Sequence, residues 1–331
     1  MSDLFIIPQS EESIIAKIEN DTISEIRQID ISWNSKNVVT ENKLIVSLCF
    51  ETSTLYIYDI LGNLLFKKNG MNYKAINYKN NIVYLGGEHN ERKMSYSIDG
   101  DMFSIINLEE SNIKAHSKHV PIKRVDGKSI DDILIHGNDL ILVDNIMYPK
   151  YLIEYDISSP ESPKHTDTIT LPNNGTYEHI IKGDINNDWL ILYSSTIGMG
   201  GFSSHITISG KTEGYLSISK SFTDNLDKEK SNSNIETVNY LDIAIFDNYL
   251  YILRTDGLGY IDLNKTISND KFKLVKTNVS NIERLIKSPC GNLIAINKND
   301  YELIKKNSNW QTLPKHSLCR LITALIHPNY A

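Results

Sequence analysis

LITALIHPNYA (321–331) and MSDLFIIPQ (1–9), the two ends of the chain, together read as strand, polar turn and strand. The same phrase occurs intact six times between them. The copies are NVVTENKLIVSL from Asn37, AINYKNNIVYLGG from Ala75, ILIHGNDLILVD from Ile133, IIKGDINNDWLILY from Ile180, IAIFDNYLYILR from Ile243 and LIKSPCGNLIAIN from Leu285. A repeat that is split between the two ends predicts a ring closed by its own ends, because pairing them removes two exposed sheet edges.

Each intact unit continues with two more short runs of β-branched and aromatic residues, such as LYIYDI (55–60) and LLFKK (64–68). Gly, Asn and Asp separate these runs, as they do in hairpins. No segment of useful length shows the 3.6-residue apolar period of a helix. We therefore predict an all-β, single-domain, seven-bladed β-propeller of four-stranded antiparallel blades. Blade one combines residues 321–331 with 1–36, and blades two to seven begin near residues 37, 73, 131, 178, 241 and 283.

Two segments resemble known propeller repeats. Ser288–Leu293, SPCGNL, is similar to the S-P-D-G-x-x-L strand turn of WD40-like and TolB-type propellers, with Cys290 at the position where Asp is usual. Asp139–Pro163 resembles bacterial repeats that have an L-V-I-V-D core and a third strand ending in D-I-S-x-P. Each likeness covers at most one blade, so it implies the generic propeller superfamily and no specific family.

The composition narrows the classes of partner. The formal net charge is −7 over 331 residues, which argues against generic nucleic-acid binding, because that needs a cationic face. The same charge is compatible with a basic protein partner. The N-terminus lacks the basic and long apolar regions of a signal peptide, and no run approaches the about 20 apolar residues of a membrane helix. We expect a cytoplasmic protein that binds neither nucleic acid nor a membrane.

No metal or cofactor site is expected. Cys49, Cys290 and Cys319 form no C-x-x-C pair, and we interpret Cys49 and Cys319, which lie beside apolar strands, as small buried residues. His116 and His119 form an H-x-x-H pair, which two solvated histidines explain better than a metal site that needs three or four ligands. No phosphate-binding loop and no G-x-S-x-G nucleophile elbow is present.

The strand order of a propeller sorts its connections onto two faces. The turns between first and second strands are all tight, whereas the long irregular segments nearly all fall on the opposite face. These segments are residues 86–93, 109–130, 144–150, 171–177, 194–204 and 223–237, mostly on blades three to five. Loops on a rigid scaffold often carry recognition, although long insertions are also tolerated without a function.

Five residues of this long-loop face are candidate partner-binding residues. In SSTIGMGGFSSH (194–205), three glycines flank Met199 and Phe202, and His205 ends the segment. An apolar pair on a flexible loop can anchor a partner, or it can fold back over the ring. Tyr148 and His89 lie in other long segments of the same face.

The sequence therefore favours a non-catalytic propeller that binds another protein. The acidic composition permits a more specific form, an immunity or inhibitor protein that neutralises a basic toxin. The alternative is a hydrolase, a lyase or a small-ligand sensor that uses the central channel. An enzyme would need a deep pocket with converging charged groups. The residues available there show no recognisable catalytic pattern; they are His136, Lys182, Arg254, Lys287 and His327.

Overall fold

All regular structure in the described part of the chain is β-strand. The computed structural model describes residues 3–10, 12–20, 22–52, 54–69, 73–87, 103–108, 117–119, 130–144, 151–170, 178–186, 188–198, 201–212, 215–222, 240–246, 248–255, 257–263, 273–275, 277, 279–288, 292–304 and 313–314. No stretch within these ranges forms a helix of the length and apolar character that a membrane crossing requires.

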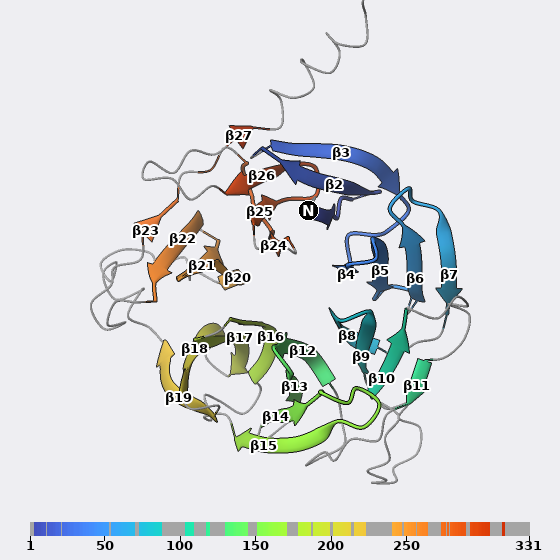
Figure 1. The fold of residues 1–331 in the computed structure, drawn as a ribbon. Coiled ribbons are helices and arrows are strands. Elements are labelled where there is room, and N and C mark those ends of the chain that lie inside the picture. The colour runs from blue at the N-terminus through green and yellow to red at the C-terminus, as the bar shows by residue number, and fades with distance from the viewer. Residues whose placement is uncertain are drawn as a thin grey trace, which may run out of the picture. The chain divides into compact units, whose positions relative to one another are not determined.

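The chain packs as two compact units, residues 34–239 and residues 1–33 with 240–331. The first unit contains four four-stranded sheets, whose strands lie side by side in chain order (Figure 1). These sheets are β4 (Ser35–Val39), β5 (Leu44–Cys49), β6 (Thr54–Asp59) and β7 (Leu64–Lys68); β8 (Tyr73–Lys79), β9 (Ile82–Gly87), β10 (Phe103–Asn107) and β11 (Ser117–His119); β12 (Ile130–His136), β13 (Asp139–Asp144), β14 (Tyr151–Asp156) and β15 (Lys164–Thr170); and β16 (Glu178–Ile185), β17 (Trp189–Gly198), β18 (Gly201–Thr212) and β19 (Tyr215–Phe222).

The second unit contains one three-stranded and two four-stranded sheets. They are β1 (Asp3–Ile7), β2 (Ser13–Glu19) and β3 (Thr22–Ile29); β20 (Tyr240–Phe246), β21 (Tyr249–Arg254), β22 (Gly257–Asp262) and β23 (Lys273–Leu274); and β24 (Arg284–Lys287), β25 (Leu293–Ile296), β26 (Tyr301–Ile304) and β27 (Leu313–Pro314). Every strand pair in both units is antiparallel. The predicted all-β antiparallel class is therefore confirmed, while the predicted closing strand, residues 321–331, lies outside the described residues.

Neighbouring sheets in each unit pack face to face. In β9, Val83 and Leu85 belong to an apolar cluster shared with the β4–β7 sheet, whereas Tyr84 belongs to a cluster shared with the β12–β15 sheet. In β25, Leu293 and Ile294 divide between two clusters in the same way. Successive side chains of a strand point to opposite faces, so one buried strand joins two sheets. Each such side chain contributes about 1.5–3 kcal/mol by leaving water.

Asn residues make some of the tight turns between first and second strands. Asn80 and Asn81, between β8 and β9, have φ angles of 48° and 60°, and Lys79 pairs with Ile82 across them. Two-residue hairpins with a type I′ turn need positive φ at both central positions, and Asn tolerates that conformation better than most residues. The sequence prediction of a tight turn here is confirmed.

The third repeat differs from the sequence prediction of an irregular segment at residues 109–130. β10 is the third strand of its sheet, and Ser117–His119, within that segment, forms the fourth. The reason is burial: the first four residues of β10 are buried, whereas the outer strand β7 is mostly exposed. A run that is apolar on both faces belongs inside a sheet rather than at its edge.

Candidate functional site

The predicted irregular segment 194–204 is wrong for most of its length. β17 has ten residues and continues to Gly198, and β18 has twelve residues and begins at Gly201. The register runs from Trp189↔Gly210 to Gly198↔Gly201. β-Branched and aromatic residues occur on both sides of the glycines and suit paired strands, so pairing continues almost to the tip.

This hairpin extends beyond the rest of its sheet. The last pair that β16 makes with β17 is Glu178↔Thr196, and the last pair between β18 and β19 is Ile206↔Phe222. Beyond Thr196, only β17 and β18 remain paired in the described chain, through Ile197↔Phe202 and Gly198↔Gly201. We call the end of this hairpin, residues 194–205, the β17–β18 ribbon. It is the one described feature that holds predicted partner-binding residues.

Two candidate residues have a defined place on the ribbon. Phe202 pairs with Ile197 next to the tip, and His205 pairs with Ser194 at the base. The backbone register therefore sets two apolar residue types opposite each other next to the tip. Met199, Tyr148 and His89 lie outside the described residues, and their part in the predicted site stays a prediction.

A second feature, which sequence reasoning missed, lies on the first strands of the sheets. β8, β12, β16 and β20 each carry a one-residue bulge. In β8, β12 and β20 it lies opposite the end of the second strand, and in β16 it lies opposite Tyr193 and Ser194 of the longer strand β17. The residues that follow the bulges occupy equivalent positions: they are Ala75, Asp132, Lys182 and Asp242. A bulge redirects the next side chain, and at two of these positions that side chain is a carboxylate.

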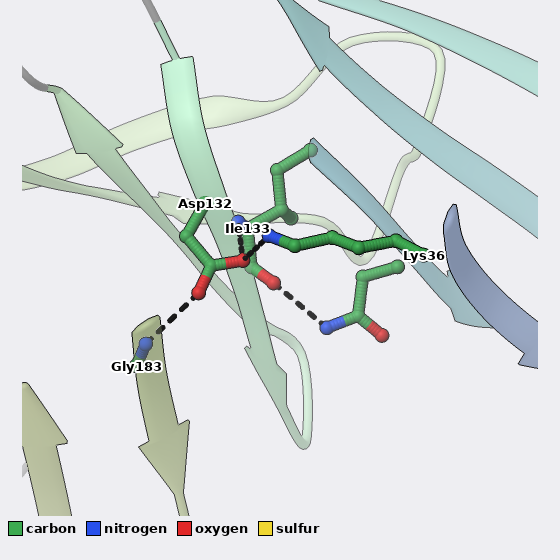
Figure 2. A network of polar contacts seen from close by, with 5 residues as sticks. Lys36, Asp132, Ile133 and Gly183 are labelled. Carbon is green, nitrogen blue, oxygen red and sulfur yellow. Dashed lines mark hydrogen bonds and ion pairs between the residues drawn. The ribbon is translucent and has the colours of Figure 1, made fainter. Parts of the chain in front are cut away.

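Asp132 joins three strands (Figure 2). One carboxylate oxygen, Oδ1, accepts hydrogen bonds from the Ile133 N–H at 3.0 Å and from the Lys36 ammonium of β4 at 3.0 Å. The other, Oδ2, accepts the N–H of Gly183 in β16 at 2.9 Å. Asp132 is 7% exposed. Both oxygens are therefore committed to donors of the protein itself.

Glycine allows this contact between β12 and β16. A Cβ atom at position 183 would lie 2.6 Å from Leu134 Cδ1, so a side chain there would force the Leu134 side chain to move. From the other side, the Asn77 amide of β8 donates to the Ile133 carbonyl at 2.8 Å. The network thus links the first strands of all four sheets in this unit.

Asp242 repeats the arrangement in the other unit. Its carboxylate accepts the N–H of Ile243 at 2.8 Å and the N–H of Leu285, in the first strand of the next sheet, at 2.7 Å. We call the two arrangements, centred on Asp132 and Asp242, the inner clamps. A sequence signal for them exists, because Asp132-Ile133 and Asp242-Ile243 stand at the same place in two repeats.

A cation also accompanies the second clamp. Arg284 donates from Nη1 to the Trp33 carbonyl at 2.7 Å, and its guanidinium lies 4.5 Å from the centre of the Trp33 ring. Burial lowers the pKa of Arg284, and the negative charges of Asp242 and Glu283 act in the opposite direction. Both clamps therefore combine a carboxylate, two backbone donors and a nearby cation, which is an arrangement suited to holding sheets in place.

The residues predicted for the channel alternative do not share one position in the sheets. Lys182 takes the place equivalent to Asp132, His136 pairs with Asp139 at the end of β12, and Arg254 ends the second strand β21. Lys287 ends β24, and His327 lies outside the described residues. Within the part of the chain that the structure describes, no three His, Cys, Asp or Glu residues are grouped to hold a metal ion.

Comparison with known proteins supports the fold. No family model and no curated protein matches the sequence. Among solved structures, a hypothetical selenium-binding protein from Sulfolobus tokodaii is 11% identical with a TM-score of 0.61, covering 95% of this chain and 90% of that one. A Lactobacillus plantarum protein is 11% identical with a TM-score of 0.59 and 95% coverage of both chains. The periplasmic gluconolactonase of Pseudomonas aeruginosa is 10% identical with a TM-score of 0.55 and 94% coverage of both.

These neighbours are of the propeller type, so the likeness to propeller repeats seen in the sequence holds at the level of the fold. At 10–11% identity they share the fold with this chain, and a fold alone does not carry a function.

Proposed function

We propose that the chain is a seven-bladed propeller, one closed ring that binds another protein through its long-loop face. The closing strand is residues 321–331, which would pair with β1 and complete the three-stranded sheet. The burial of β1 supports this assignment, because all five of its residues are buried. The second strands β5 and β25 of other sheets are buried in the same way. β1 therefore corresponds to a second strand, and the strand that would complete its sheet is the first, innermost one.

The sequence also supplies a register for the closing strand. ALIH at 324–327 followed by DLFII at 3–7 matches ILIH at 133–136 followed by DLILV at 139–143. In the latter pair, Ile133 lies opposite Leu142 and Ile135 opposite Leu140. The equivalent pairs in the first sheet are Ala324 with Ile6 and Ile326 with Leu4.

The β17–β18 ribbon is the observation that favours protein binding. It projects beyond its sheet and carries Ile197 and Phe202 as the pair next to the tip, with Met199 in the connection between them. Apolar residues on a projecting, strand-paired support can anchor a partner with little loss of conformational entropy. His205 at the base, with Tyr148 and His89 in neighbouring long segments, completes the proposed surface.

The inner clamps favour the same proposal over a catalytic centre at their position. Asp132 has both oxygens engaged by three donors, which suits a fixed structural link. The partner we propose is a basic protein, since the chain has a net charge of −7 and opposite charge accelerates association. An immunity or inhibitor role in the cytoplasm is the specific form of this proposal.

Affinity purification with a shortened ribbon tests the function. Replacing residues 197–202 by Asn-Gly joins the paired residues Thr196 and Ser203 through a two-residue hairpin turn, so the sheet is retained. The control variant is Phe50→Ser, which removes an aromatic ring that is 38% exposed at another site. We expect the wild type and the control to retain the same partner from cells of the source organism and the shortened variant to lose it. Equal recovery by all three proteins would exclude the ribbon as the site. Failure to recover a partner, combined with turnover of an ester or glycan, would favour the catalytic alternative.

A further inference from the structure

An exposed apolar surface lies at the β6–β7 hairpin, in a different sheet from the β17–β18 ribbon. Leu61 is 59% exposed, Leu64 is 50% exposed and Leu65 is 42% exposed. These three leucines fall within five consecutive residues, whereas the other large exposed apolar residues of the described chain are scattered singly. A cluster of this kind is more informative than single exposed leucines, which are common on protein surfaces.

The position of β7 in its sheet explains the exposure. β7 is the last strand of the β4–β7 sheet, and it pairs with β6 through Tyr58↔Leu64 and Ile57↔Phe66. Leu65 is the extra residue of a bulge between these pairs. An outer strand presents backbone donors and acceptors on its far side, where another strand can add.

The turn before β7 is held firmly. The Asp59 carboxylate accepts the N–H of Leu61 at 2.9 Å and the N–H of Asn63 at 2.8 Å through one oxygen, Oδ1. The Gly62 N–H bonds to the Asp59 carbonyl at 3.0 Å, and Gly62 has the positive φ of 78° that this turn requires. Leu61 and Leu64 therefore flank a turn that is ordered before any partner arrives, which lowers the entropic cost of binding.

The second half of β7 is positively charged. Lys67 and Lys68 are exposed and follow the leucines directly. The Lys67 ammonium lies 5.3 Å from the centre of the Tyr56 ring, a contact that favours one position for this charge. Along strand β7, the apolar residues of the first half are thus followed by the cationic residues of the second half.

We propose that β7 binds an extended segment of another protein as a fifth strand, antiparallel to β7. In this orientation the N-terminal half of the segment is acidic and lies opposite Lys67 and Lys68, and its C-terminal half is apolar and lies opposite Leu64 and Leu65. Every strand pair of this sheet is antiparallel, which favours that direction. A second copy of this chain fits less well, because antiparallel pairing of two β7 strands around Phe66 places leucines opposite lysines and supplies no acidic group.

Two labelled peptides of the same composition test the proposal against the full-length chain. EDETVTV has the acidic half first, and VTVTEDE has it last. We expect fluorescence anisotropy to show that EDETVTV binds and that VTVTEDE binds at least about tenfold more weakly. Equal affinity of the two peptides, or no binding of EDETVTV at about 1 mM, would overturn the proposal.

Matched variants locate the binding. Leu64→Thr with Leu65→Thr should weaken EDETVTV by at least about tenfold. The control is Ile26→Thr, because Ile26 is the bulge residue of the equivalent outer strand β3 and is 39% exposed. Lys67→Glu with Lys68→Glu should abolish EDETVTV binding and create binding of a KRKTVTV peptide. This charge exchange still tests the proposal if the leucine variant does not fold. Unchanged EDETVTV affinity in the leucine variant, or failure of the charge exchange, would refute the proposal. The result is independent of the β17–β18 ribbon.

Discussion

Removing the Asp132 carboxylate is the sharpest test of the inner clamps. Asp132→Ala leaves the N–H groups of Ile133 and Gly183 without the acceptor that now lies at 3.0 and 2.9 Å. A hydrogen bond to a charged group contributes about 1.5–3 kcal/mol, so losing two would cost about 3–6 kcal/mol. Water entering the space left by the side chain offsets part of this loss. We expect the free energy of unfolding to fall by about 3 kcal/mol.

The ion pair contributes much less than the backbone contacts. The Lys36 side chain is 32% exposed in the pair with Asp132, and solvent-exposed ion pairs are worth only about 0–1 kcal/mol. Lys36→Met is therefore the matched control, with an expected loss below about 1 kcal/mol. Asp132→Asn should fall between the two variants, because its amide oxygen can accept one of the two N–H groups.

The assay combines urea unfolding with hydrogen–deuterium exchange of β16. Asp132→Ala should shift the unfolding midpoint far more than Lys36→Met does and should speed exchange of the peptide that contains Gly183. If both variants lose the same stability, or if β16 exchanges as in the wild type, the clamp is not the link between these sheets.

Three further outcomes follow from local geometry. Gly86→Ala should cost about 1–3 kcal/mol by overpacking, because its Cβ would lie 2.5 Å from Ile130 Cγ2; a urea midpoint equal to the wild type would contradict this. Burial raises the pKa of Tyr84 from 10.0 to about 12. Tyr84 has a higher pKa in the folded state than in the unfolded state, so the stability that its neutral phenol contributes is fully present below pH 10 and is lost as the pH rises through 12. Between these two pH values, the free energy of unfolding of Tyr84→Phe should therefore fall less than that of the wild type. Hydrogen bonds from the Ser158 hydroxyl and backbone N–H lower the pKa of Asp156; Ser158→Ala should raise it in an NMR titration of the carboxyl group, and an unchanged value would rule out the hydroxyl as the main cause.

The fold class was predictable from sequence because strand alternation and turn residues are local signals. The Asn80-Asn81 turn is an example, since positive φ at both positions is a property of the turn itself. Strand β11 has the sequence SKH, which contains no alternation of apolar residues from which a strand could be predicted. The length of the β17–β18 ribbon was missed for the opposite reason, since its glycines suggested a loop although they occur only around the tip.

The inner clamps could not be predicted from the sequence, for a geometric reason. Asp132 bonds to Gly183, which lies 51 residues away in the chain. Their meeting depends on a bulge before Asp132 and on the close approach of β12 to β16 at Gly183, and neither can be read from residue types alone. The repeat of an Asp-Ile pair in two units was visible, but only the structure gives it a role.

A disulfide cross-link tests the closed ring most directly. In a chain whose three native cysteines are replaced by alanine, Ile6→Cys is combined with Ala324→Cys, which the proposed register places opposite each other. The control combines Ile6→Cys with Leu325→Cys, because a slip of one residue turns the side chain to the other face of the sheet. After oxidation and proteolysis, mass spectrometry should find the 6–324 cross-link in high yield and the 6–325 cross-link in low yield. Equal yields, or no 6–324 cross-link in the folded protein, would contradict closure of the ring by its own ends.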